Sequence, residues 1–261
     1  MTKDLKNGII KIIRDRLNIF NEREGCMYKT HEYISEINND DILWKYMDLS
    51  KFLSLLTTQK AWFTRLDKFK DDVYEGRYPI ANIKKRPLIY SDGFCPSQEM
   101  YDKFEQITRT QNFVWCFHKN KFESAAMWKL YAKDNGIAIK TTGEKLKQAF
   151  KNEEKDIYIT PITYIDYSED FMPEGLAFYG ALHKRMSFEY EKEVRCFYFE
   201  NNSVKCKDKD GLLINISLDE LIDEIIISPY AQTYIKDSIQ SVINKYGLNS
   251  MVTKSLLNDL Y

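Results

Sequence analysis

Short apolar runs of strand length are the feature that most constrains the fold of this chain. We predict strands at residues 42–47, 61–66, 112–118, 137–139, 157–167, 194–199, 212–216 and 224–227, and near residue 251. Several follow one another without an intervening helix, whereas every parallel pair needs a long crossover connection. The pattern therefore predicts an α+β fold, with a mixed, largely antiparallel sheet and flanking helices.

Helical spacing of apolar residues predicts helices at residues 5–20, 124–133, 174–188 and 234–246, and a short one near residue 218. Asp48 or Ser50 is a suitable N-cap for a helix ending at Leu56, and Ser124 for the helix that Gly136 stops. Residues 22–41 and the stretch after the acidic segment 71–76, to about residue 97, are predicted to be irregular. No repeat or linker divides the chain, so we predict an N-terminal helical arm at residues 1–40 and a single α+β domain at residues 41–261.

Composition indicates a reduced, cytoplasmic protein. Lys and Arg number 38 against 39 Asp and Glu, so net charge does not indicate a nucleic-acid partner. Five scattered cysteines suit neither a disulfide framework nor a zinc site. Residues 1–14 lack the apolar stretch of a signal peptide, and no window approaches the roughly 20 apolar residues of a membrane span.

Residues 188–195, Phe-Glu-Tyr-Glu-Lys-Glu-Val-Arg, form the strongest candidate site. If the chain is extended from residue 191, the side chains of Glu191, Glu193 and Arg195 share one face. Two carboxylates beside a guanidinium can perform acid/base chemistry or hold a sugar hydroxyl. The alternative is a structural ion pair at the end of a strand, and the sequence leaves both interpretations open.

Each of the other candidates also has a structural interpretation. Asp71, Asp72 and Glu75 are either oxygen ligands for a hard cation or a solvated loop. His118 lies at the end of a predicted buried strand. It can act there as a base or hydrogen-bond donor, or it can be a structural histidine. The rings of Tyr46, Trp128 and Tyr131, with Lys45 beside the first, can stack on a base or belong to the core. Lys184 and Arg185 can bind a diphosphate or neutralise Glu189 and Glu191.

Familiar catalytic motifs are missing from the sequence. It has no Gly-rich phosphate loop, no Gly-x-Ser-x-Gly elbow and no His-Glu-x-x-His helix, and it has only three histidines. We therefore predict no metal site firmly.

The order of these pieces is similar to that of a bacterial family, domain of unknown function 2971. The family pattern runs from Lys-Tyr on an early strand, through an Asn-Asp-Pro-aromatic-Glu loop and a Met-Trp-x-x-Tyr-Ala helix, to Lys and then Tyr-Glu-x-Glu-aromatic-Arg. The matching residues are Lys45, Tyr46, Asp72, Tyr74, Glu75, Met127, Trp128, Tyr131, Ala132, Gly136, Lys184, Tyr190, Glu191, Glu193 and Arg195. Asp71, Val73, Phe188 and Val194 depart from the pattern, and the family name supplies no reaction.

The arrangement also resembles that of ADP-ribosyltransferases, which cleave NAD at the nicotinamide bond. This resemblance implies NAD as substrate, Glu193 stabilising the ribose cation and Glu191 orienting or deprotonating the acceptor. It also implies that Tyr46 or Tyr131 stacks on nicotinamide and that Lys45 or Arg195 meets phosphate. His118, Trp128 and Lys184 complete the predicted nucleotide-binding set.

Three hypotheses follow for the function. The first is an NAD-utilising ADP-ribosyltransferase or glycohydrolase, acting as a toxin or phage-defence effector. The second is a non-catalytic sensor or partner-binding module, in which Glu191, Glu193 and Arg195 fasten their strand to the loop at residues 71–75. The third is a metal-dependent nuclease built on Asp72, Glu75 and the two later glutamates.

Overall fold

The computed structural model describes residues 28–31, 34–90 and 96–258. Its strands are β1 (Tyr28–Lys29), β2 (Ile42–Met47), β3 (Lys60–Arg65), β4 (Asn112–Lys119), β5 (Ile137–Thr142), β6 (Ile157–Pro161), β7 (Thr163–Ile165), β8 (His183–Arg185), β9 (Glu193–Phe199), β10 (Gly211–Asn215), β11 (Glu224–Ile227) and β12 (Val252–Lys254). Most of the predicted strands are therefore present, with ends that differ by a few residues.

The α-helices are α2 (Leu49–Thr58), α3 (Ile80–Ile89), α4 (Gln98–Gln111), α5 (Ala125–Met127), α6 (Gly143–Gln148), α7 (Tyr179–Leu182), α8 (Ser203–Cys206), α9 (Leu218–Leu221) and α10 (Tyr234–Lys245). The described residues also form the 3-10 helices Leu66–Lys68 and Met186–Glu191 and the π-helix Trp128–Ala132. Asp48 caps α2, since its carboxylate accepts the Lys51 N–H at 2.8 Å, and Ser124 caps α5.

One large sheet organises the described chain, in the order β1-β6-β9-β4-β2-β5-β11-β12. The pairs β1–β6 and β11–β12 are parallel, while the other described pairs of this sheet are antiparallel. The small second sheet pairs β7 with β8 in parallel. The α+β class with a mixed, largely antiparallel sheet and flanking helices is thus confirmed.

The sheet forks along β4. Near its start, Phe113 and Val114 pair with β3, which continues to β10. Near its end, His118 and Lys119 pair with β2 instead. On the opposite edge β9 pairs with β4 from Asn112 to His118. The first residues of β9 therefore lie beside the end of β4, close to the start of β2.

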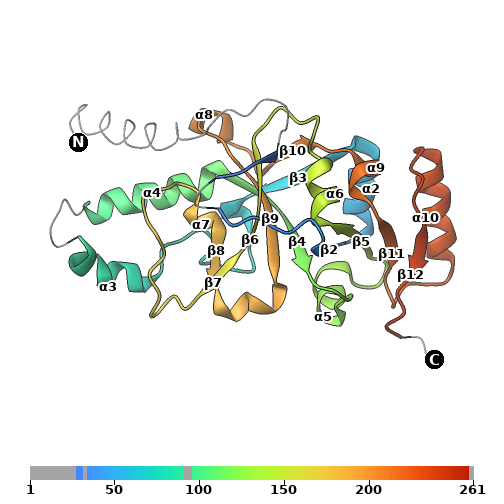
Figure 1. The fold of residues 1–261 in the computed structure, drawn as a ribbon, viewed down its shortest axis with the longest axis horizontal. Helices are drawn as coiled ribbons and strands as arrows, with labels where there is room; N and C mark the ends of the chain where they lie inside the picture. Colours follow the sequence, from blue (N-terminus) through green and yellow to red (C-terminus); the bar gives the residue numbers. More distant parts are fainter. Residues whose placement is uncertain (1–27, 32–33, 91–95, 259–261) are drawn as a thin grey trace.

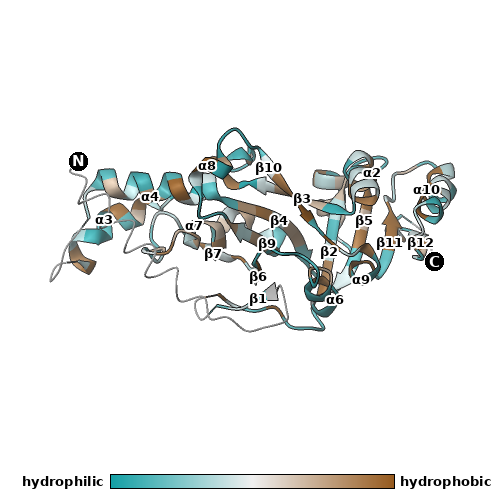
Figure 2. Ribbon diagram, turned by 90° about the horizontal axis from the view of Figure 1, so that it is seen from above, coloured by the Kyte–Doolittle hydropathy of each residue, from teal (hydrophilic) through white to brown (hydrophobic). Residues whose placement is uncertain are grey.

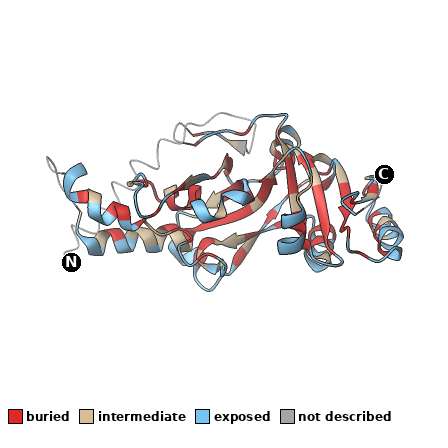
Figure 3. Ribbon diagram, turned by 90° about the horizontal axis from the view of Figure 1, so that it is seen from below, coloured by how far each residue is buried: buried red, intermediate tan, exposed pale blue. Residues whose placement is uncertain are grey.

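The two faces of the sheet are covered differently. The largest core joins one face to apolar residues of α2, α6, α9 and α10. The other face carries two smaller clusters: one around Phe178, Leu182 and Phe197, and one around Tyr46 and Trp128. Figure 2 shows the strands as the more hydrophobic part, and Figure 3 shows buried residues along the middle of the molecule. α3 and α4 lie at one end and α10 at the other (Figure 1).

Two sequence predictions about elements need correction, and two helices were missed. The predicted helix at residues 174–188 is wrong, because only Tyr179–Leu182 is α-helical before β8 and a 3-10 helix. The stretch to residue 97 contains α3, and α4 and α6 were not predicted. The predicted helix at residues 5–20 lies outside the described residues.

Candidate functional site

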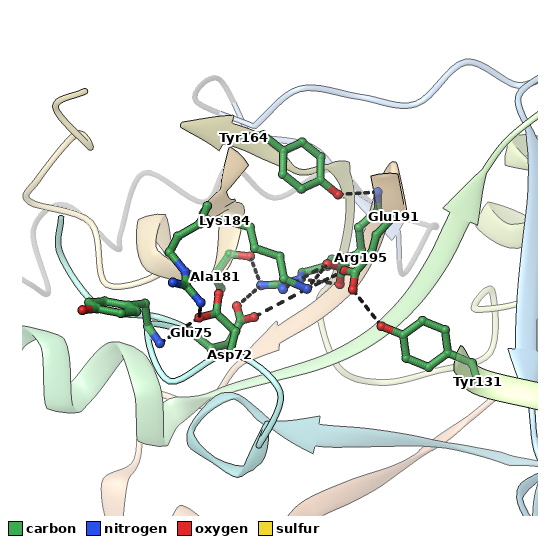
Figure 4. Close-up of polar contacts among 11 residues, drawn as sticks. Asp72, Glu75, Tyr131, Tyr164, Ala181, Lys184, Glu191 and Arg195 are labelled. Atoms are coloured by element: carbon green, nitrogen blue, oxygen red, sulfur yellow. Dashed lines mark hydrogen bonds and ion pairs between the residues drawn. The ribbon is translucent and has the colours of Figure 1, made fainter. Parts of the chain in front are cut away.

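A buried group of charged side chains lies on the second face of the sheet, between its two smaller apolar clusters. Glu193 and Arg195 come from β9, and alternation along the strand directs both to this face together with Phe197. Lys184 comes from β8, Glu191 ends a 3-10 helix, and Glu75 belongs to the loop after β3. Figure 4 shows Glu75, Lys184, Glu191 and Arg195 close together, with Tyr131 bonded to Glu191. We call Glu75, Lys184, Glu191, Glu193 and Arg195 the charged cluster.

Arg195 is the centre of the charged cluster and is 0% exposed. Its guanidinium donates from Nε to Glu193 Oε1 at 2.7 Å and from Nη2 to Glu193 Oε2 at 3.2 Å. Nη1 donates to the Ala181 carbonyl at 2.9 Å and lies 2.8 Å from Glu75 Oε1. Such two-point pairing fixes the carboxylate of Glu193 in direction as well as in distance.

Lys184 joins the two later glutamates. Its Nζ donates to Glu191 Oε2 at 2.5 Å and to Glu193 Oε2 at 3.3 Å, and lies 3.9 Å from Glu75 Oε2. The other oxygen of Glu191 accepts the phenol O–H of Tyr131 at 2.7 Å. Tyr131 is 37% exposed, so Glu191 is the member of the charged cluster that a surface side chain touches directly.

The extended chain predicted from residue 191 is wrong by two residues. Lys192 adopts a left-handed conformation, with φ 40° and ψ 52°, and its N–H donates to the Glu189 carbonyl. The strand therefore begins at Glu193, and Glu191 reaches the same cation from a different element. Tyr164 supports this junction, because its phenol oxygen accepts the Glu193 N–H at 2.8 Å. Tyr164 was not a predicted site residue, and Glu75 was predicted only as a candidate metal ligand.

Two of the three carboxylates in the acidic loop at residues 71–75 are buried, so the loop is not fully solvated. Asp72 and Glu75 are both buried, whereas Asp71 is exposed. Asp72 Oδ1 accepts the Tyr74 N–H at 2.9 Å and a guanidinium N–H of Arg185 at 2.6 Å. The predicted role of Lys184 and Arg185 is thus only partly correct: Lys184 neutralises Glu191, but Arg185 binds Asp72 instead of Glu189.

Charge in the cluster is uneven, with three carboxyl groups against two cations. Burial raises the pKa of Glu75 despite the opposing effect of Arg195. Burial would also raise the pKa of Glu193, but Arg195 and Lys184 hold it well below its usual range. The raised pKa of Glu75 favours its neutral form, whereas the two cations favour the ionised form of Glu193.

His118 and the aromatic residues predicted to bind nucleotide have mainly structural contacts. His118 pairs with Glu193 across the strands, and its Nδ1 lies 2.5 Å from the Glu191 carbonyl. Burial lowers the pKa of His118. Tyr46 is buried against Trp128 and its phenol accepts the Ser124 N–H at 2.8 Å. Trp128 is fully buried and donates from Nε1 to Glu123 at 2.9 Å.

Lys45 lies on the opposite face of the sheet from the charged cluster. Its Nζ donates to the Cys116 carbonyl at 2.7 Å, inside the fork between β2 and β3. The rings of Trp115 and Phe117 lie 5.4 Å and 5.8 Å from this ammonium group. Burial lowers the pKa of Lys45, although nearby Cys116 opposes the shift. The structure therefore does not bring Lys45 together with the predicted catalytic carboxylates.

Exposed aromatic rings lie around the charged cluster. Tyr131 of the π-helix contacts Glu191, and Tyr190, which precedes Glu191 in the sequence, is exposed. Phe188 lies 4.7 Å from Lys184 Nζ, and the Arg185 guanidinium lies 4.6 Å from the ring of Tyr74. Carboxylates below partly exposed rings suit a ligand that has both a planar ring and hydroxyl groups.

Searches against protein-family models, curated proteins and solved structures found no match. The resemblance to domain of unknown function 2971 therefore stays a prediction. In residues 28–31, 34–90 and 96–258, no helix is long and apolar enough to span a bilayer. The same residues contain no group of three or more His, Cys, Asp or Glu side chains arranged to hold a metal ion.

Proposed function

We propose that the protein cleaves the nicotinamide bond of NAD, as an ADP-ribosyltransferase or an NAD glycohydrolase. The observation that carries the proposal is Glu191, whose carboxylate is held between buried Lys184 and the partly exposed phenol of Tyr131. A carboxylate fixed in this way, next to exposed aromatic rings, is suited to a ribose with an attached planar base.

The proposed chemistry uses few groups. The bond between ribose C1′ and the nicotinamide nitrogen breaks, neutral nicotinamide leaves, and positive charge develops on the ribose. Glu191 stabilises that charge and accepts the proton of the attacking water or acceptor hydroxyl. With water, the products are nicotinamide, ADP-ribose and one proton.

The geometry changes the roles implied by the resemblance. Both oxygens of Glu193 bind Arg195, and Arg195 is fully buried, so we assign these two residues to positioning Lys184 and Glu191. Of the two rings that the resemblance implies, Tyr46 and Tyr131, we assign the stacking role to the partly exposed Tyr131. The ADP-ribosyltransferase-like fold, the cytoplasmic location and a role as a toxin or phage-defence effector belong to the same proposal.

The test is nicotinamide release from NAD by the wild-type protein and by two variants. Glu191→Gln keeps the shape of the side chain but cannot take a proton, so we expect release to fall by roughly 100-fold or more. Tyr131→Phe should reduce release less, because it removes one hydrogen bond. Glu189→Gln, an exposed glutamate of the same 3-10 helix, is the matched control and should be unchanged.

Far-UV circular dichroism confirms that each variant is folded before release is compared. Wild-type protein without NAD cleavage, or a folded Glu191→Gln variant with normal release, would overturn the proposal. The first result would favour the second candidate, a non-catalytic binding module, and the second would mean that a residue other than Glu191 carries the cleavage. The binding-module candidate is supported by the 2.8 Å contact between Arg195 Nη1 and Glu75 Oε1, which joins β9 to the acidic loop.

The metal-dependent nuclease has less support from the site. Asp72 lies against Arg185, Glu75 against Arg195, and the later glutamates against Lys184. These cations already supply the positive charge that clustered carboxylates need.

A further inference from the structure

A groove with a volume of about 600 Å3 opens beside the charged cluster, with Glu193 in its lining. It forms where four segments meet: the start of β2, the end of β4, the junction of β6 and β7, and the start of β9. Its volume lies within the roughly 300–1,000 Å3 typical of small-molecule sites. Glu193 is the only predicted site residue in its lining.

The middle of the groove is largely apolar. Ile42, Pro161, Ile162 and Val194 contribute to its lining, and Tyr164 adds an aromatic ring. The Tyr164 ring is held in place because its phenol oxygen accepts the Glu193 N–H at 2.8 Å. A surface of this kind can bury the planar or apolar body of a ligand.

The charged residues of the groove are not all neutralised by one another. Lys119 binds Asp41 at 2.7 Å, and Glu193 binds Arg195 and Lys184 within the charged cluster. Lys121 and Lys192 are exposed, and no carboxylate of the described residues lies within 4.0 Å of either ammonium group. Against these two cations stands one exposed carboxylate, that of Asp40.

We propose that this groove binds a small organic phosphate with a ring body, of the size of a nucleoside diphosphate. The ring packs on the apolar lining beside Tyr164, and the ammonium groups of Lys121 and Lys192 bind the phosphate oxygens. Lys192 lies between Glu191 and Glu193 in the sequence, so a bound phosphate contacts the residue that joins the two carboxylates. Binding in the groove requires no NAD cleavage.

The test measures binding of ADP by calorimetry, with adenosine and inorganic pyrophosphate as comparison probes. Wild-type protein should bind ADP more tightly than either probe, because each probe lacks half of the recognised groups. The double variant Lys121→Glu with Lys192→Glu should weaken ADP binding by roughly tenfold or more, since it replaces two attractive charges by repulsive ones. Lys236→Glu, an exposed lysine on α10, is the matched control and should bind as the wild type does.

Three results would overturn the proposal: no ADP binding by the wild type, equal weakening in the Lys236→Glu control, or normal binding by the folded double variant. Equal affinity for pyrophosphate and ADP would overturn the assigned role of the apolar lining. ADP binding without any NAD cleavage would support the groove while contradicting the proposed function, so the two proposals fail separately.

Discussion

Glu75 shows how one buried side chain decides the charge balance of the site. Three carboxyl groups and two cations share one desolvated volume, and both Glu75 oxygens lack a hydrogen bond of good geometry. The 2.8 Å contact with Arg195 is therefore a close approach of charges that lacks the geometry of a directed hydrogen bond. A neutral Glu75 fits this position better than a third negative charge would.

This balance predicts a pH dependence of stability. Because burial raises the pKa of Glu75, the folded protein holds this proton more tightly than the unfolded chain does. The contribution is complete below the unfolded pKa, about 4.3, and is lost as pH rises through the folded value. The free energy of unfolding should thus fall by up to about 1.4 kcal/mol per pH unit within that window.

Glu75→Gln should remove this slope, because glutamine stays neutral at every pH. Urea unfolding of the wild type and the variant from pH 5 to pH 8 is the measurement, with exposed Glu189→Gln as control. If the variant kept the wild-type slope, Glu75 would not be the group that holds the proton.

For individual residues, the sequence predicted which side chains belong to the site better than it predicted the contacts between them. Alternation along one strand correctly placed Glu193 and Arg195 on one face. Glu75 lies far from them in the sequence, and its burial depends on the loop packing against β9. The burial of Tyr46 and Trp128, compared with the exposure of Tyr131, likewise depends on the π-helix.

Among the elements, the fork in β4 was not predicted by any sequence pattern. Between the part that pairs with β3 and the part that pairs with β2, the carbonyl of Cys116 meets the ammonium group of Lys45. A long basic side chain thus replaces the backbone donor that a neighbouring strand would supply.

Lys45→Met should leave that carbonyl without a donor and lower the free energy of unfolding by about 1–3 kcal/mol. Lys60→Met, an exposed lysine on β3, should change it by less than about 0.5 kcal/mol. Urea denaturation measures both, and hydrogen exchange should show faster opening of β2 and β4 in the first variant only. Equal stability of the two variants would argue against the role of Lys45.

Elements with a strong local pattern were predicted well, and those fixed by distant contacts were not. β11 matches its apolar run at Glu224–Ile227, and α2 begins after the Asp48 cap. The segment 174–188 has helical spacing, but Gly175 at φ 103° interrupts it and β8 pairs with β7 instead. α4 was missed because its buried face includes Thr108 and Gln111, which weakens the apolar pattern.

For the whole molecule, the described chain is organised around one continuous sheet. The helices α3 and α4 lie at one end and α10 at the other (Figure 1); α4 leads into β4, and α10 lies between β11 and β12 of the same sheet. The fork does not separate the strands into two sheets, because β9 spans it on the other edge of β4. If the chain forms the single domain that the sequence predicts, the whole sheet should unfold in one cooperative step.

The four tryptophans can report whether unfolding is cooperative across the fork. Trp44 lies on β2, Trp62 on β3, Trp115 on β4 and Trp128 on the π-helix, so they sample both arms. If the sheet unfolds as a unit, tryptophan fluorescence and far-UV circular dichroism should give one urea midpoint. Two separate midpoints would mean that the β3–β10 arm unfolds independently, and a Trp62→Phe variant would then lose the fluorescence change of that step alone.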